Sequence, residues 1–176
     1  AKGSKTPKVE IIEVSDFQCP YCRRVNPTMK KLLATYGKDV RVRFLHQPLP
    51  FHREAKKAAV ASAAAGMQGK FWPYHDKLFA NQRALKPSQL EQYAKELAAS
   101  DSAFSFAKWK TDFNNPVRDA FVDRNQATAI AVRATGTPMF FVNGKTLRGA
   151  QPYPKFEAIV KAEIAAAGKR SGQRWI

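Results

Sequence analysis

The chain has little cysteine, little acidic charge and no long hydrophobic run. Two cysteines are too few for a disulfide-rich small protein or a four-cysteine zinc site. The longest nearly apolar stretch, residues 58–67, has ten residues and is mostly alanine. A helix that crosses a bilayer needs about 20 apolar residues, so we expect no membrane span.

The remaining composition is that of one globular domain. The chain has 176 residues, of which 44% are hydrophobic and 11% aromatic, so it can bury a sizeable core. A disordered or collagen-like chain is therefore excluded. We expect a flexible basic lead-in over residues 1–8, a single domain over residues 9–168 and a basic tail over residues 169–176.

The charge balance is strongly basic, with 30 lysines and arginines against 14 acidic residues and a net charge of +16. A basic surface can attract nucleic acid, anionic lipid or acidic proteins. However, no segment combines aromatic residues with a dense basic run, which is typical of nucleic-acid binding. We therefore expect solvated lysines and no nucleic-acid partner.

Local patterns predict the order βαβ, then helices, then ββα. The predicted strands cover residues 9–14, 40–45, 139–142 and 146–147, and Asn143-Gly144 between the last two is typical of a tight hairpin turn. The first and last helices are predicted over residues 20–36 and 154–167. Residues 52–134 show only helical signals, among them a capping box that begins at Ser88. One sheet covered by helices and carrying a helical insertion is a three-layer α/β fold.

The candidate reactive residues lie in the segment Cys19-Pro20-Tyr21-Cys22, between the first predicted strand and the helix that follows it. Free N–H groups and the positive end of the helix dipole favour a thiolate at Cys19. Cys22 follows one turn later, where it can displace a partner from a mixed disulfide at Cys19. The spacing therefore favours a redox-active pair.

Three other interpretations stay open. The pair could be a structural disulfide, although so short a loop constrains little of the unfolded chain. It could be two inert buried thiols. It could also contribute to a zinc site with His46 and His52, although residues 23–45 resemble a complete helix and strand rather than a small metal-held loop.

Two segments carry a resemblance to a known family. Phe17-Gln18-Cys19-Pro20-Tyr21-Cys22 and Gly136-Thr137-Pro138-Met139-Phe140-Phe141-Val142-Asn143-Gly144, with helices between them, resemble the DsbA-like branch of the thioredoxin superfamily. The similarity extends from residue 9 to about residue 167. It implies a thioredoxin-like fold with an all-helical insertion over about residues 52–134, and thiol:disulfide exchange on exported proteins without a cofactor beyond the two cysteines.

The resemblance also implies roles for single residues. Cys19 matches the attacking cysteine and Cys22 the resolving one, and Pro20 and Tyr21 between them tune the redox potential. Pro138 matches a cis-proline, which with Thr137 contacts the substrate. Tyr21 replaces the histidine of strongly oxidising members, so we expect a less oxidising protein.

Glu13 lies six residues before Cys19 in an otherwise apolar strand. Burial there would raise its pKa, and the resemblance places an acid here that moves the proton of Cys22. A strand-end glutamate that reaches solvent is the alternative. For His46, His52 and His75 we expect structural or surface roles and no metal.

These observations predict a thiol:disulfide oxidoreductase, with disulfide formation favoured over reduction or isomerisation. The expected partners are unfolded or thiol-containing proteins and a redox protein that reoxidises or rereduces the pair. The chain begins at Ala1 without an apolar signal segment. We therefore expect a processed form or a piece of a longer protein, located in the periplasm or elsewhere outside the cytoplasm. A zinc-stabilised basic binding module, or a redox-inactive relative that only holds peptides, is the alternative from another class.

Overall fold

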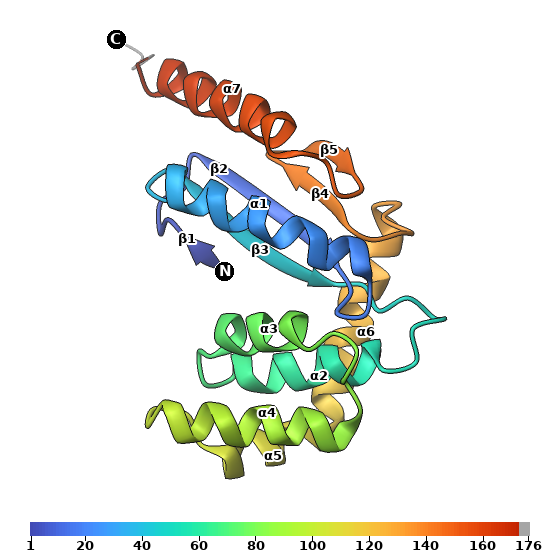
Figure 1. Ribbon diagram of the computed structural model, residues 1–176. Coiled ribbons are helices and arrows are strands. Elements are labelled where there is room, and N and C mark those ends of the chain that lie inside the picture. Colours follow the sequence, from blue (N-terminus) through green and yellow to red (C-terminus); the bar gives the residue numbers. More distant parts are fainter. Residues whose placement is uncertain (173–176) are drawn as a thin grey trace.

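A five-stranded mixed sheet forms the centre of the computed structural model, which describes residues 1–172 (Figure 1). The strand order is β1-β3-β2-β4-β5. β2 runs parallel to β3 and antiparallel to β4, and β1 and β5 are antiparallel edge strands. In chain order the elements are β1 (Lys2–Gly3), β2 (Val9–Ser15), α1 (Pro20–Tyr36), β3 (Val40–His46), α2 (Ala55–Gly66), α3 (Phe71–Ala80), α4 (Pro87–Ser100), α5 (Phe106–Phe113), α6 (Pro116–Ala131), β4 (Met139–Val142), β5 (Lys145–Arg148) and α7 (Tyr153–Gly172).

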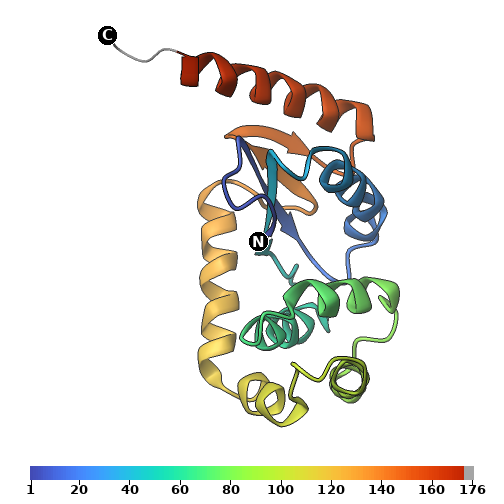
Figure 2. The ribbon, with the colours of Figure 1, turned by 90° about the vertical axis from the view of Figure 1, so that its left-hand side faces the viewer.

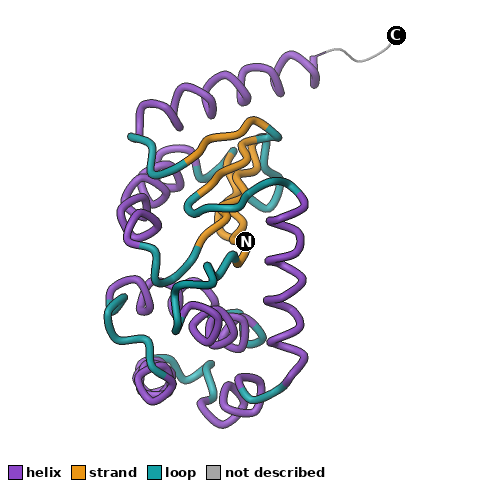
Figure 3. The backbone as a smooth tube through the Cα atoms, turned by 90° about the vertical axis from the view of Figure 1, so that its right-hand side faces the viewer, coloured by secondary structure: helices purple, strands orange, loops and turns teal. Residues whose placement is uncertain are grey.

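Helices cover both faces of the sheet, which confirms the three-layer α/β fold (Figures 2 and 3). β-branched residues fill the central strand β2, and its side chains alternate between the faces. On one face β2 packs with α1 and α7 through a cluster that includes Val9, Leu32 and Phe156. On the other face Val14 packs with Ala129 of α6.

Helices α2–α5 form a second apolar cluster beside the sheet, centred on Tyr74, Leu90 and Trp109. Phe17, Cys19 and Cys22 belong to this cluster, although Cys22 lies on α1 and Phe17 is the second residue after β2. The two cysteines therefore lie where the sheet meets the helical part of the chain. No helix among the described residues is long and apolar enough to cross a membrane.

The hairpin prediction is confirmed. Asn143 and Gly144 connect β4 to β5 with φ values of 46° and 86°. Both residues thus adopt the left-handed conformation that a tight two-residue hairpin turn requires.

The lead-in prediction for residues 1–8 was wrong in part. Lys2 and Gly3 pair with Val42 and Arg41, so they extend the sheet as β1. The pairing satisfies backbone groups of β3 that would otherwise form an open edge. Gly3 has a φ of 107°, a conformation that favours glycine.

The ends of two helices also differ from expectation. Helix α4 begins at Pro87 rather than after a Ser88 cap, and the Gln89 side chain accepts a hydrogen bond from the Lys86 N–H at 2.9 Å. Helix α7 continues to Gly172, five residues beyond its expected end, so residues 169–172 are helical. The rest of the expected basic tail, residues 173–176, lies outside the described residues.

Candidate active site

Cys19 is the residue that immediately precedes helix α1. Its backbone is extended, with φ −73° and ψ 118°, and Pro20 occupies the first helical position, where no N–H is needed. The Cys19 N–H donates to the carbonyl oxygen of Asp16 at 3.1 Å. The turn from β2 into α1 thus places the Cys19 sulfur at the positive end of the helix, as the sequence predicted.

The two cysteines are free thiols in very different environments. A hydrogen bond from the Cys22 thiol, assisted by Thr137 and by the N–H groups of Cys22 and Tyr21, lowers the pKa of Cys19 from 9.0 to about 5. Burial raises the pKa of Cys22 well above its ordinary value, because its side chain is fully enclosed. At neutral pH the pair therefore consists of a Cys19 thiolate and a Cys22 thiol.

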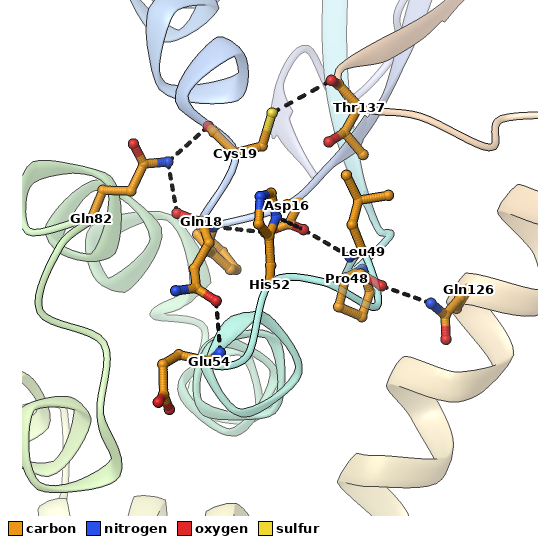
Figure 4. Close-up of polar contacts among 11 residues, drawn as sticks. Asp16, Gln18, Cys19, Pro48, Leu49, His52, Glu54, Gln82, Gln126 and Thr137 are labelled. Carbon is orange, nitrogen blue, oxygen red and sulfur yellow. Dashed lines mark hydrogen bonds and ion pairs between the residues drawn. The ribbon is translucent and has the colours of Figure 1, made fainter.

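Thr137 lies against the reactive sulfur. The Cys19 sulfur lies 3.4 Å from the Thr137 carbonyl oxygen, to which the thiol form of Cys19 donates a hydrogen bond (Figure 4). The Thr137–Pro138 peptide bond is cis. The structure thus brings Thr137 and Pro138, predicted from the second motif, next to Cys19.

Glu13 is enclosed, with only 1% of its surface exposed, so the solvent-reaching alternative is excluded. Burial raises its pKa from 4.5 to about 7, against a smaller opposing effect of the Ser15 hydroxyl. Ser15 also lowers the pKa of Cys22. Its hydroxyl is thus near both groups, without a hydrogen bond of ordinary length to either. Sequence reasoning missed Ser15, although it lies two residues after Glu13 and hence on the same face of β2.

Tyr21 and Pro20 lie at the surface beside the pair. The Tyr21 side chain is 54% exposed, and the Arg24 guanidinium lies 5.0 Å from the centre of its ring. Tyr21 stabilises the Cys19 thiolate through its backbone N–H. The tuning role predicted for this dipeptide stays a prediction.

Asp16 organises the loop before Cys19, and sequence reasoning missed it. Its fully enclosed carboxylate accepts hydrogen bonds from the Gln18 N–H at 2.7 Å, the Leu49 N–H at 2.8 Å and His52 Nδ1 at 2.7 Å (Figure 4). The bond to Gln18 is an Asx-type turn that the sequence Asp-Phe-Gln could have indicated. The other two contacts join segments that are far apart in sequence.

The helical part of the chain fixes the same loop from the other side. The Gln82 side-chain amide donates to the carbonyl oxygens of Phe17 at 2.8 Å and Cys19 at 2.7 Å (Figure 4). The Glu54 N–H donates to the Gln18 side chain at 2.6 Å. No local sequence pattern indicates these contacts, which position the cysteine backbone.

The histidines do not join the cysteines as a zinc site would require. His46 lies in an aromatic cluster with Phe17 and Phe44, and burial lowers its pKa to about 3. His52 is held by Asp16. Within residues 1–168, no three or more His, Cys, Asp or Glu side chains gather in a metal-binding arrangement. The geometry therefore disfavours the zinc alternative.

Comparison with known proteins identifies the fold. Residues 1–162 match the family described as Thioredoxin. Among solved structures, the thiol-disulfide exchange protein alpha-DsbA2 from Wolbachia pipientis is similar with a TM-score of 0.81 at 14% identity, covering 92% of this chain and 84% of that one. Oxidised BdbD from Bacillus subtilis gives 0.80 at 22%, covering 93% and 91%. The catalytic domain of Proteus mirabilis ScsC gives 0.74 at 24%, covering 93% and 88%.

Curated relatives are larger proteins. The chain is 35% identical over 161 residues to a protein named Na(+)/H(+) antiporter NhaA from Herminiimonas arsenicoxydans, which covers 92% of this chain and 25% of the relative. A second protein of that name, from Salinispora tropica, is 34% identical over 178 residues, covering 96% and 25%. The chain thus spans about a quarter of the length of the curated relatives it matches.

Proposed function

Because the chain belongs to the thioredoxin family and has a DsbA-like fold, we propose that it exchanges disulfides with exported proteins through Cys19 and Cys22. The carrying observation is the difference between the two thiols: the pKa of Cys19 is lowered to about 5 and that of Cys22 is raised. A thiolate is the attacking species in disulfide exchange, and a thiol of low pKa is also the better leaving group. Cys19 is therefore the cysteine that bonds to the substrate.

We propose disulfide formation as the physiological direction. A substrate thiolate attacks the Cys19 sulfur of the Cys19–Cys22 disulfide, and Cys22 leaves as a thiolate that takes a proton from Glu13. A second substrate thiolate then attacks the substrate sulfur of the mixed disulfide, so that Cys19 leaves as a thiolate. Two electrons pass from the substrate dithiol to the pair. The low pKa of Cys19 supports this direction, because a stabilised thiolate makes the disulfide a stronger oxidant.

Thr137 and Pro138 are proposed to contact the substrate, since Thr137 lies against the Cys19 sulfur. An extended peptide segment can pair with exposed backbone groups in this manner. The partners are thiol-containing or unfolded proteins outside the cytoplasm, together with a redox protein that reoxidises the pair. The extracytoplasmic setting is supported by the likeness to a periplasmic thioredoxin-like protein from Salmonella enterica serovar Typhimurium, at a TM-score of 0.68 and 25% identity over 93% of this chain and 88% of that one.

The reduction potential of the pair tests the direction. It is measured in glutathione buffers by thiol alkylation and mass spectrometry, with metal content determined on the same sample. Strong oxidants such as DsbA have a potential of about −120 mV, and thioredoxin has one of about −270 mV. We expect the potential of this pair to lie closer to the first value. A potential near that of thioredoxin would indicate a reductase or isomerase. Bound zinc without a titratable disulfide would overturn the redox assignment.

Two variants test the roles of the cysteines. Cys19→Ser is expected to abolish exchange, and retained insulin reduction would overturn the assignment. Cys22→Ser is expected to accumulate mixed disulfides with thiol-containing peptides, because nothing then displaces the peptide from Cys19. Failure to accumulate them would remove the resolving role of Cys22.

A further inference from the structure

A small cavity lies between β2, α1 and α3. Its volume is about 20 Å³, enough for one water molecule. Glu13, Trp72 and His75 line it. Each has a buried polar atom without a hydrogen-bond partner among the described residues: Oε1 of Glu13, Nε1 of Trp72 and Nε2 of His75. A buried water usually satisfies two to four such atoms, so the cavity matches a water site.

On its inner side the cavity is lined by Glu13, which neighbours the resolving cysteine through Ser15. Glu13 and Ser15 point to the same face of β2, and the Ser15 hydroxyl lies near both the Glu13 carboxylate and the Cys22 thiol. A proton that leaves Cys22 thus has an acceptor in Glu13. The carboxylate is enclosed, however, so its proton needs a further path to solvent.

On its outer side the cavity leads to the surface through α3. His75 Nδ1 lies 3.0 Å from Asp76 Oδ1, and Asp76 Oδ2 lies 3.1 Å from the Lys30 amine. The exposed fraction of the side chain rises from 5% at His75 to 35% at Asp76 and 59% at Lys30. Because Asp76 accepts from Nδ1–H, the neutral ring carries its free lone pair on Nε2, the atom without a protein partner.

We propose that His75 is a positioning residue that relays the proton of Glu13 between a cavity water and solvent, by way of Asp76. This inference rests on the proposed function. When the pair is reoxidised and Cys22 resolves the mixed disulfide between Cys19 and the redox partner, its thiol proton passes to Glu13, the Cys22–Cys19 disulfide forms, and the partner leaves as a thiolate. Glu13 then gives its proton to the water, the water gives one to Nε2, and Nδ1 releases one toward Asp76. One proton thus reaches solvent for each mixed disulfide resolved.

The charges around His75 are compatible with such a relay. The titratable groups near it are Asp76 on its own helix, Glu13 from β2, Lys2 from β1, Lys30 from α1 and His46 from β3. Burial lowers the pKa of His75, and Lys2 and Lys30 act in the same direction, while Asp76 opposes them. The ring is therefore neutral at rest and releases a proton readily once it has taken one up.

The test follows two phases in a single turnover of the reduced protein with oxidised glutathione. Acid quench and mass spectrometry separate mixed-disulfide formation at Cys19 from its resolution by Cys22, between pH 5 and pH 9. His75→Phe keeps an aromatic ring in the cluster and removes both nitrogens. Asp76→Asn removes the outer carboxylate at a partly exposed position, so it carries the test if His75→Phe fails to fold.

A packing control comes from the same cluster. Phe79 is 3% exposed and its ring centre lies 4.9 Å from that of His75, so Phe79→Leu disturbs the packing without removing a proton carrier. Thermal unfolding of each variant shows whether it is folded.

We expect His75→Phe to slow resolution about tenfold at pH 7 and Asp76→Asn to slow it several-fold, with formation unchanged within twofold. The apparent pKa of resolution should rise by about one unit in His75→Phe, because the Glu13 carboxylate loses a hydrogen-bonded water that stabilises its charge. Phe79→Leu should keep the wild-type profile. Unchanged resolution in folded His75→Phe and Asp76→Asn, or the same change in Phe79→Leu, would overturn the relay. If the wild-type protein forms no mixed disulfide at all, the proposed function fails instead.

Discussion

The sulfur of Cys19 lies 3.4 Å from the carbonyl oxygen of Thr137, which is 118 residues further along the chain. The contact joins the two halves of the thioredoxin sheet at the reactive atom, because Cys19 follows β2 and Thr137 precedes β4. A thiol can donate to this carbonyl, whereas a thiolate cannot. Within the part of the chain that the structure describes, the buried Thr137 hydroxyl has no other partner, so it is available to the thiolate.

Thr137→Val should therefore destabilise the Cys19 thiolate. Thr137 lowers the pKa of Cys19, so removal of its hydroxyl is expected to raise that pKa and make the disulfide a weaker oxidant. The thiolate absorbance of the reduced protein, followed against pH, measures the change. Thr146→Val on the exposed strand β5 is the matched control. An unaltered titration in Thr137→Val would show that the hydroxyl does not stabilise the sulfur.

Cys22 is expected to contribute more than Thr137, because its hydrogen bond is the largest cause of the low pKa of Cys19. In wild-type protein the rate of Cys19 alkylation by iodoacetamide should rise with pH through a midpoint near 5. In Cys22→Ala, which removes the donor, the midpoint should move toward the ordinary thiol value. A midpoint that stays near the wild-type one would assign the effect to the helix terminus instead.

The elements that sequence patterns predicted are those whose cause is local. Helix α1 follows from Pro20 at its first turn, and the β4–β5 hairpin from Asn143-Gly144. Strand β1 was missed because it depends on the edge of β3 rather than on its own two residues. The Ser88 cap was predicted at the wrong residue because Pro87 fits the first helical turn better.

The same distinction holds for the site. The sequence indicated Cys19, Cys22 and Thr137 through two compact motifs. The contacts of Asp16 with Leu49 and His52 were not predictable, because they arise only once segments 33 and 36 residues apart are folded together. These contacts hold the loop that precedes Cys19 in place, although neither Leu49 nor His52 belongs to a motif.

Asp16→Ala should be strongly destabilising. It removes the acceptor of two backbone N–H groups and of His52 Nδ1 at a fully enclosed carboxylate. Donors left without an acceptor in this enclosed site cost about 3 kcal/mol in the free energy of unfolding. Asp123→Ala is the control, since its ion pair with Lys56 is 53% exposed on the aspartate side and should change stability by less than about 1 kcal/mol. Urea unfolding of both variants measures the difference, and equal stabilities would contradict the role of Asp16.

Glu13 should make the stability of the protein fall as the pH rises. Its pKa is about 7 in the folded chain and 4.5 in an ordinary setting. Between these values the folded state holds a proton that the unfolded state has released, so the free energy of unfolding decreases from about pH 4.5 to about pH 7. A shift of this size at an enclosed carboxyl corresponds to about 3 kcal/mol, present below about pH 4.5 and lost above about pH 7.

Glu13→Gln should remove this pH dependence, because the amide does not titrate. Cys19 acts in the opposite direction in the reduced form, since its lowered pKa favours the folded state increasingly as the pH rises from about 5 toward 9. The comparison is therefore made between Cys19→Ser and the double variant that also carries Glu13→Gln. Because Cys19 is absent from both, their difference reports the titration of Glu13. Urea unfolding of both reduced proteins at pH 5 and pH 8 measures the difference. If the single and the double variant lose the same stability between these pH values, the Glu13 carboxyl is ionised in the folded protein and does not hold the proton for Cys22.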